Sequence, residues 1–333
     1  MVERVTEPRA LAGRSADWAG ARVLVLGLGD AGFAAVDTLV ELGAIVLVAA
    51  EGARDDTRRL VEMLGAETLL AALEPVPGRI EAFAPQLAIV SPGIAPDAAV
   101  LRALRDRGVP VWGDVELAWR LRDRVRAAPW LQLAGGGAGL AADILLHLIA
   151  TAGGRVVLVG AEAPAVLDAV RDPAGFDALV VQLDERQLRH AAAWPVSPLA
   201  SVVIDPGTAD PAVLGRVYAN TSIACVYDRA EPATRRMVED ADVVEGARAI
   251  GIGLDAPGLS DLGLVAGLLI DRAFHPDRQH SALELASLGE LTAAGLGEPQ
   301  SVRAALAAAA LARALGLGPE AVAAGLASFA DRR

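Results

Sequence analysis

The sequence predicts an α/β protein with two domains and mostly parallel sheets. Two stretches carry this prediction, residues 21–51 and residues 129–149, because in each an apolar run of strand length enters a glycine cluster and a helix-like run leaves it. A chain of 333 residues is long enough for two hydrophobic cores. We therefore expect one domain over residues 1–127 and a second over residues 128–333.

The composition restricts the class of protein. Hydrophobic residues make up 53% of the chain and charged residues 22%, which is typical of a packed globular protein. No apolar run is long enough to span a bilayer and the N-terminus lacks the apolar core of a signal peptide, so we expect a cytoplasmic protein without membrane insertion. A net charge of −12 disfavours nucleic acid as a partner. The single cysteine, Cys225, lies in an apolar run and is expected to be a buried core residue.

The first glycine cluster follows a predicted buried strand at residues 23–26. A helix over residues 33–42 follows the cluster and is closed by Gly43. The cluster has the GxGxxG spacing of a turn that approaches a nucleotide diphosphate, and a purely structural tight turn is the alternative; its residues are Gly27, Leu28, Gly29, Asp30, Ala31 and Gly32. Glu51 stands near the end of the next strand, and dinucleotide sites have an acidic residue at the end of that strand that contacts a ribose. Here Ala50 precedes Glu51, so whether Glu51 has that role stays open.

The rest of the first domain alternates helices and strands. We predict a helix over residues 57–73, a strand over 87–90, a helix over 98–107 capped by Gly108, and a short strand over 110–112. A further helix begins at residues 113–116. The strand over 87–90 ends in three residues that join the nucleotide-site candidates, Ser91, Pro92 and Gly93.

The second glycine cluster has the layout of a phosphate-binding loop. A strand over residues 130–134 leads into Gly135, Gly136, Gly137 and Gly139, and a helix over 140–149 follows. A loop of the GxxxxGK[ST] type also needs a Lys for the β- and γ-phosphates and a hydroxyl for Mg²⁺. Gly139 and Leu140 occupy those two places, and the chain contains no Lys.

Several segments resemble one known family in order and spacing. The runs DWAGARVLVLGLGDAGF, SPGIAPD and VPVWGDVELAWRL resemble the N-terminal UDP-binding domain of the Mur ligases, in particular the actinobacterial UDP-N-acetylmuramoyl-L-alanine:D-glutamate ligases (MurD). Four further segments are similar to the central domain of that family: residues 176–188, residues 220–251, the run LLIDRAF (residues 268–274) and the expected helix pair VRAALAAAALARALGLGPEAVAAGLASF (residues 302–329). The resemblance implies a Rossmann-like first domain, a central P-loop-type α/β domain, and ATP-dependent amide formation with Mg²⁺.

The sequence departs from the family where its chemistry is expected. The family loop TGTNGKTT corresponds to residues 134–141, where the Lys and both Thr are missing, and the metal-binding Glu corresponds to Gln182. The chain stops at about the place where the family's third domain begins. From these departures we expect no catalytic residue, no metal and no cofactor, with ATP and Mg²⁺ unable to bind productively and the third domain absent.

The resulting first hypothesis is a catalytically inactive homologue with a binding, scaffolding or regulatory role in peptidoglycan precursor synthesis. Its hypothesised partners are a UDP-linked cell-wall precursor, a Mur ligase, a cell-division protein or a second copy of the chain. One alternative is a sensor for UDP-sugars or UDP-N-acetylmuramoyl peptides that uses the first glycine cluster and Ser91, Pro92 and Gly93. Another alternative is an ATP-dependent ligase that needs a partner chain.

Overall fold

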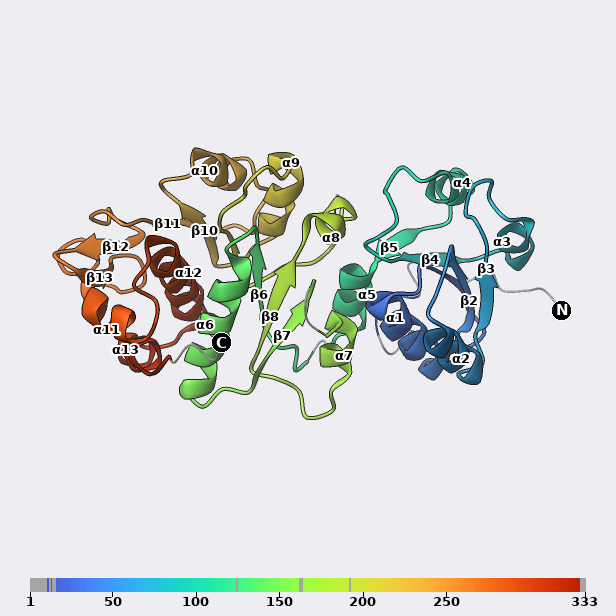
Figure 1. Ribbon diagram of the computed structural model, residues 1–333, viewed down its shortest axis with the longest axis horizontal. Helices are drawn as coiled ribbons and strands as arrows, with labels where there is room; N and C mark the ends of the chain where they lie inside the picture. The colour runs from blue at the N-terminus through green and yellow to red at the C-terminus, as the bar shows by residue number, and fades with distance from the viewer. Residues whose placement is uncertain are drawn as a thin grey trace. The chain divides into compact units, whose positions relative to one another are not determined.

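The computed structural model describes residues 11, 13, 16–123, 125–161, 164–191 and 193–329 (Figure 1). These residues form two compact units. The first unit spans residues 1–127 and takes in residues 164–175 and 189–195, and the second holds the remainder. The division of the chain into domains at residue 127 stays a prediction.

The first unit contains a five-stranded parallel sheet in the order β3-β2-β1-β4-β5. Its core strands are fully buried apolar runs, as parallel strands covered on both faces require. Its strands are β1 (Arg22–Leu26), β2 (Ile45–Ala50), β3 (Glu67–Leu70), β4 (Leu87–Val90) and β5 (Val111–Gly113). Its helices are α1 (Asp30–Glu41), α2 (Asp55–Met63), α3 (Gly78–Phe83), α4 (Ala99–Asp106), α5 (Asp114–Leu121) and α7 (Val166–Arg171).

One predicted element of this unit is wrong. Residues 57–73 were expected to be a single helix, but α2 ends at Met63 and β3 begins at Glu67. Gly65 has a φ of +90°, which stops the helix, and the residues beyond it pair with β2 from Leu47 onward. Pairing with the edge of the sheet therefore overrides the local helical pattern.

The second unit contains a nine-stranded sheet in the order β14-β13-β12-β11-β10-β9-β6-β8-β7. Strands β7 to β12 and β6 pair in parallel, and β12-β13-β14 continue the sheet as antiparallel hairpins. The strands are β6 (Trp130–Ala134), β7 (Val156–Gly160), β8 (Ala178–Leu183), β9 (Ala200–Val203), β10 (Ala224–Asp228), β11 (Arg248–Ile252), β12 (Asp261–Val265), β13 (Leu268–Asp271) and β14 (Leu283–Ser287).

Two long helices cover one face of this sheet and form its main core. Helix α12 is rich in alanine, and its buried small side chains let it lie directly beside α6, as Figure 1 shows. The helices of the unit are α6 (Ala138–Thr151), α8 (Glu185–Arg189), α9 (Pro211–Leu214), the 3₁₀ helix η2 (Gly215–Tyr218), α10 (Pro232–Glu239), α11 (Leu288–Ala293), α12 (Pro299–Leu315) and α13 (Pro319–Ser328). The fold is therefore α/β with mostly parallel sheets, and the predicted fold class is confirmed.

None of the helices in the described part of the chain is both long and apolar enough to cross a bilayer.

Candidate functional site

The first glycine cluster forms the turn between β1 and α1. Gly27 has a φ of +90°, and a Cβ added at Gly32 would lie 2.2 Å from the carbonyl oxygen of Gly27. Both positions therefore need glycine for the turn to close. A Cβ added at Gly29 would meet nothing within 4 Å, so the outer side of the turn is open to a ligand.

Ser91 lies against this turn. Strand β4 is the direct neighbour of β1, so Ser91 follows β4 at the same edge of the sheet. Its Oγ donates a hydrogen bond of 3.3 Å to the carbonyl oxygen of Gly27. The structure thus brings together two of the predicted candidate segments, Gly27–Gly32 and Ser91–Gly93, which are separated by more than fifty residues in the sequence.

The helix that leaves the turn presents its N-terminus to the same side. No side chain caps α1 at Gly29, and the first backbone N–H groups of any helix lack a partner within the helix. These N–H groups and the helix dipole favour an anion such as a diphosphate. Leu28 is buried and Ala31 half-buried, so these two residues serve the packing of the turn.

Two acidic candidates stand at the open side of the turn. The side chain of Asp30 is 95% exposed and its nearest cation is Arg54, with an Nη2 to Oδ1 distance of 3.7 Å. Glu51 is exposed and follows β2, the other neighbour of β1. Neither carboxylate is fixed against the turn by a hydrogen bond, and their roles toward a ligand stay predictions.

The second glycine cluster is closed on one side by the segment that follows β9. Gly136 donates its N–H to the carbonyl of Asp205 at 2.8 Å, and Gly137 donates to the carbonyl of Ile204 at 3.2 Å. A Cβ added at Gly135 would lie 2.1 Å from the oxygen of Ile204. Glycine is therefore required here for packing between two neighbouring loops, a role that the sequence pattern did not reveal.

The other side of this turn is the N-terminus of α6. A Cβ added at Gly139 would meet nothing within 4 Å, and Leu140 packs its side chain against the hydrophobic core. In the described residues, the backbone N–H groups of Gly139 and Leu140 have no acceptor. The turn therefore offers backbone donors that fit a phosphate group, although its side chains supply neither an ammonium group nor a hydroxyl.

Gln182 lies beside this turn, on the strand next to β6. It pairs with Leu133 on one side and Gly160 on the other, and its carbonyl accepts a hydrogen bond of 2.9 Å from the N–H of Ala161. Asp184 follows at the end of the same strand and caps α8, since its Oδ1 accepts a hydrogen bond from the N–H of Gln187 at 2.8 Å.

Within the described residues, no group of three or more His, Cys, Asp or Glu side chains is placed to hold a metal ion.

The structure also shows a partly buried ion pair that the sequence did not indicate. Arg303 in α12 lies with its Nε 3.3 Å from Oδ2 of Asp228, whose side chain is 3% exposed at the end of β10. The next residue, Arg229, pairs with Asp255 and Asp261. No local sequence signal relates Arg303 to Asp228, because the two residues meet only when α12 packs across the end of the sheet.

Comparison of the sequence with curated proteins places it among ligases. The chain is 47% identical over 332 residues to the UDP-N-acetylmuramoylalanine–D-glutamate ligase of Leifsonia xyli subsp. xyli. This alignment covers 93% of the present chain and 64% of the Leifsonia protein. It is 39% identical over 322 residues to the protein of the same name from Streptomyces avermitilis, and this alignment covers 94% of the present chain and 68% of the Streptomyces protein. The chain thus spans about two thirds of the length of these relatives. A scan against protein-family models found no match.

Solved structures support the fold. The chain superimposes on the murein peptide ligase of Psychrobacter arcticus with a TM-score of 0.53 at 12% identity, covering 93% of this chain and 68% of that one. The UDP-N-acetylmuramate:L-alanyl-gamma-D-glutamyl-meso-diaminopimelate ligase of Neisseria meningitides gives a TM-score of 0.55 at 13% identity, covering 95% and 100%. At these identities the likeness concerns the fold alone.

The relatives overturn one expectation from the sequence. We expected no cofactor, with ATP and Mg²⁺ unable to bind productively, because Gly139, Leu140 and Gln182 replace the side chains that the family uses. The relatives that match over 93–94% of the chain are ligases, and amide formation in this family depends on ATP and Mg²⁺, so that expectation is wrong. The expectation rested on side chains alone, whereas the backbone N–H donors at the N-terminus of α6, which suit a phosphate group, stay in place.

The order of strands, the two glycine turns and the sequence identity all agree with one assignment. The predicted resemblance is confirmed, and the chain belongs to the Mur ligases, in the UDP-N-acetylmuramoylalanine–D-glutamate ligase (MurD) family.

Proposed function

We propose that the chain acts in the ATP-dependent ligation of D-glutamate to UDP-N-acetylmuramoyl-L-alanine, as the part that holds the UDP-linked precursor and the nucleotide. The observation that carries the proposal is the identity of 39–47% to ligases of this name over more than nine tenths of the chain. The comparisons favour this function over the inactive homologue that the sequence first suggested, because every relative named above is a ligase.

The geometry supports a division of labour between the two glycine turns. The turn at Gly27–Gly32, with Ser91 beside it, offers an open helix N-terminus to the diphosphate of the precursor. The N-terminus of α6 offers the N–H groups of Gly139 and Leu140 to a phosphate of the nucleotide. ATP with Mg²⁺ would supply the phosphoryl group that activates the precursor carboxylate.

The chain spans about two thirds of the relatives' length, so the proposal includes a second polypeptide segment that completes the ligase. That segment would be a partner chain or a further part of the same protein. The unit described here then binds and orients precursor and nucleotide, and the additional segment holds the incoming amino acid.

The binding half of the proposal is tested with Gly29→Ala. A methyl group at position 29 meets no atom of the protein within 4 Å, and Gly29 has an ordinary φ of −84°, so the substitution should not disturb the fold. A loss of affinity would therefore come from contact between the methyl group and the ligand. Isothermal titration with UDP-N-acetylmuramoyl-L-alanine should show binding to the unchanged chain and a loss of about tenfold or more for Gly29→Ala. Gly289→Ala in α11 serves as the matched control and should bind normally. No detectable binding by the unchanged chain would refute the precursor role.

The ligation half is tested by release of ADP. The chain is incubated with UDP-N-acetylmuramoyl-L-alanine, D-glutamate, ATP and Mg²⁺, alone and together with the C-terminal third of an actinobacterial relative. We expect ADP release that depends on D-glutamate when the two polypeptides are combined. A mixture that binds both substrates and releases no ADP would contradict the ligase proposal and leave precursor binding, the alternative predicted from the sequence, in its place.

A further inference from the structure

Asp205 lies at the second glycine turn with an exposed carboxylate. It is the second residue beyond the end of β9, and β9 pairs directly with β6, the strand that leads into the turn. The carbonyl of Asp205 accepts a hydrogen bond from the N–H of Gly136 at 2.8 Å, so its backbone is fixed against the turn. Within the part of the chain that the structure describes, the carboxylate has neither a hydrogen bond nor an ion pair.

The side chain of Asp205 lies against the turn itself. A Cβ added at Gly136 would lie 3.0 Å from Oδ2 of Asp205, so the lack of a side chain at Gly136 leaves room for this oxygen. Gly136 comes two residues before the start of α6, and no side chain caps the N-terminus of that helix. A carboxylate is thus held close to a helix N-terminus that it does not cap.

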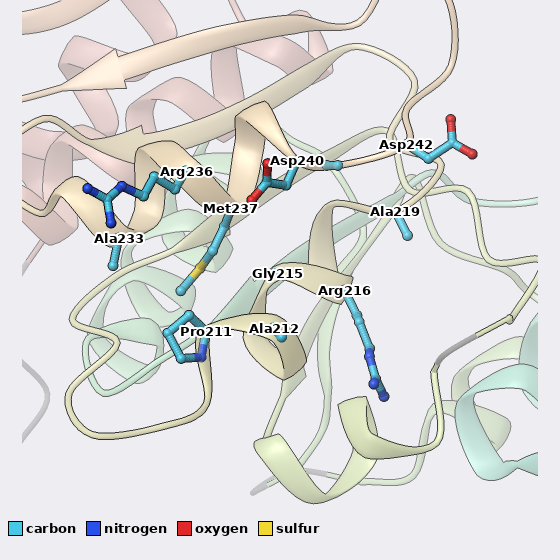
Figure 2. A pocket seen from close by; sticks show the side chains of 11 residues that line it. Pro211, Ala212, Gly215, Arg216, Ala219, Ala233, Arg236, Met237, Asp240 and Asp242 are labelled. Atoms are coloured by element: carbon cyan, nitrogen blue, oxygen red, sulfur yellow. The ribbon is translucent and has the colours of Figure 1, made fainter.

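Two further acidic residues near this edge of the sheet have structural partners. Asp210, the next one along the chain, is the N-cap of α9, and its Oδ1 accepts a backbone N–H at 2.9 Å. Figure 2 shows the start of α9 at Pro211, on one side of a groove whose other side is α10. Asp184, which follows β8 on the opposite side of β6, caps α8 and pairs with Arg186 at 2.7 Å. In the described residues, Asp205 is therefore the one of these three acids whose carboxylate is left for a ligand.

The charge of Asp205 opposes a bare phosphate at this turn, because a carboxylate and a phosphate repel each other. A divalent cation between the two groups reverses the sign of the interaction, since it binds oxygens of both. Mg²⁺ is usually held in this way, by one or two carboxylates together with phosphate oxygens of the substrate and water molecules. One free carboxylate beside a phosphate-binding turn fits this mode of binding.

We propose that Asp205 is the protein ligand for the Mg²⁺ ion of the nucleotide. This role rests on the proposed function, because it takes the N-terminus of α6 as the place where the nucleotide phosphate binds. Enzymes with a phosphate loop hold the ion with a hydroxyl of the loop and an aspartate from outside it. Here Leu140 has no hydroxyl, and Gln182 of β8 carries a neutral amide. The carboxylate is instead supplied from the other neighbour of β6, the strand β9.

The test is isothermal titration of the full chain with ATP, once in excess Mg²⁺ and once in EDTA. The unchanged chain should bind ATP more tightly in Mg²⁺. Asp205→Asn should weaken binding in Mg²⁺ by about fivefold or more, because a neutral amide is a poorer ligand for the ion than a carboxylate. The same variant should strengthen binding in EDTA by about twofold, because the repulsion of the phosphates is removed. A merely structural role of Asp205 would shift both affinities in the same direction.

The substitutions are chosen to preserve the backbone. Asp205 has a φ of +52°, which asparagine adopts more readily than most residues. Asp205→Gly accepts the same φ and should give the same reversal of the two affinities, and circular dichroism checks that both variants are folded. Asp55→Asn at the start of α2 makes the same change of charge in the first unit and should alter neither affinity.

The outcomes separate this role from the proposed function. If the unchanged chain binds no ATP in either solution, the nucleotide half of the proposed function is refuted, and the role of Asp205 with it. If the chain binds ATP but Mg²⁺ brings no gain in affinity, the role of Asp205 alone is refuted. The same holds if the folded variants Asp205→Asn and Asp205→Gly keep the full gain from Mg²⁺.

Discussion

Asp30 is the residue whose replacement tests the first glycine turn most directly. It is the first residue of α1, its side chain is 95% exposed, and the nearest cation, Arg54, is itself 82% exposed at 3.7 Å. A carboxylate at a helix N-terminus stabilises the helix but repels a diphosphate that approaches the same N–H groups. Asp30→Asn should therefore increase the affinity of the turn for UDP.

The size of the effect follows from the Coulomb energy. Two unit charges 4 Å apart in water interact with about 1 kcal/mol, and a diphosphate at about 6 Å that carries two charges is repelled by a similar amount in total. Salt at about 0.1 M screens roughly half of this, and Arg54 offsets a further part. About 0.5 kcal/mol remains, so the expected gain in affinity is about two- to threefold.

The assay is isothermal titration of UDP and of uridine at low and high salt. Asp30→Asn should bind UDP more tightly than the unchanged chain, with the difference shrinking as salt is added, and both should bind uridine equally. Asp55→Asn, a comparable exposed carboxylate at the start of α2, serves as the control. Weaker binding of UDP by Asp30→Asn would refute the reasoning, because it would mean that the Asp30 carboxylate accepts a hydrogen bond from the ligand.

Four further predictions concern stability and thiol reactivity. Gly32→Ala should lower the free energy of unfolding by about 1–3 kcal/mol, because the new methyl group overlaps the carbonyl of Gly27. Urea titration measures this loss, and an unchanged midpoint of the urea unfolding curve would show that the turn can relax. Asp271→Ala should cost about 3–5 kcal/mol in the same assay, since it leaves the guanidinium of Arg313, 9% exposed and 2.9 Å away, without its carboxylate; a loss below 1 kcal/mol would contradict this. Burial raises the pKa of Cys225 from 9.0 to about 11, so the folded state binds the proton more tightly and stability should be full below pH 9 and fall between pH 9 and pH 11. The thiol should react with Ellman's reagent at pH 8 only after unfolding, and rapid reaction of the native chain would show that it is accessible.

Much of the fold could be predicted because its signals are local. Apolar runs at residues 23–26, 87–90 and 130–134 form strands β1, β4 and β6, and Gly43 and Gly108 follow the helices that they were expected to close. Strand length, glycine positions and helix caps depend on a few neighbouring residues, so they can be read from the chain. The helix predicted over residues 57–73 was wrong because its last part finds a partner in β2, which lies twenty residues earlier.

The sequence by itself determined the α/β class, the two strand–turn–helix units and the family. The class and the two units follow from short local motifs, and the family follows from the identity of the whole sequence to its relatives. Only the tertiary structure decided what those motifs touch. It places Ser91 on the turn at Gly27, closes the turn at Gly136 with the carbonyl of Asp205, and joins residues 164–175 to the first unit. These contacts link residues that are far apart in the chain, and their geometry depends on how neighbouring strands and helices pack, which no local pattern of residues specifies.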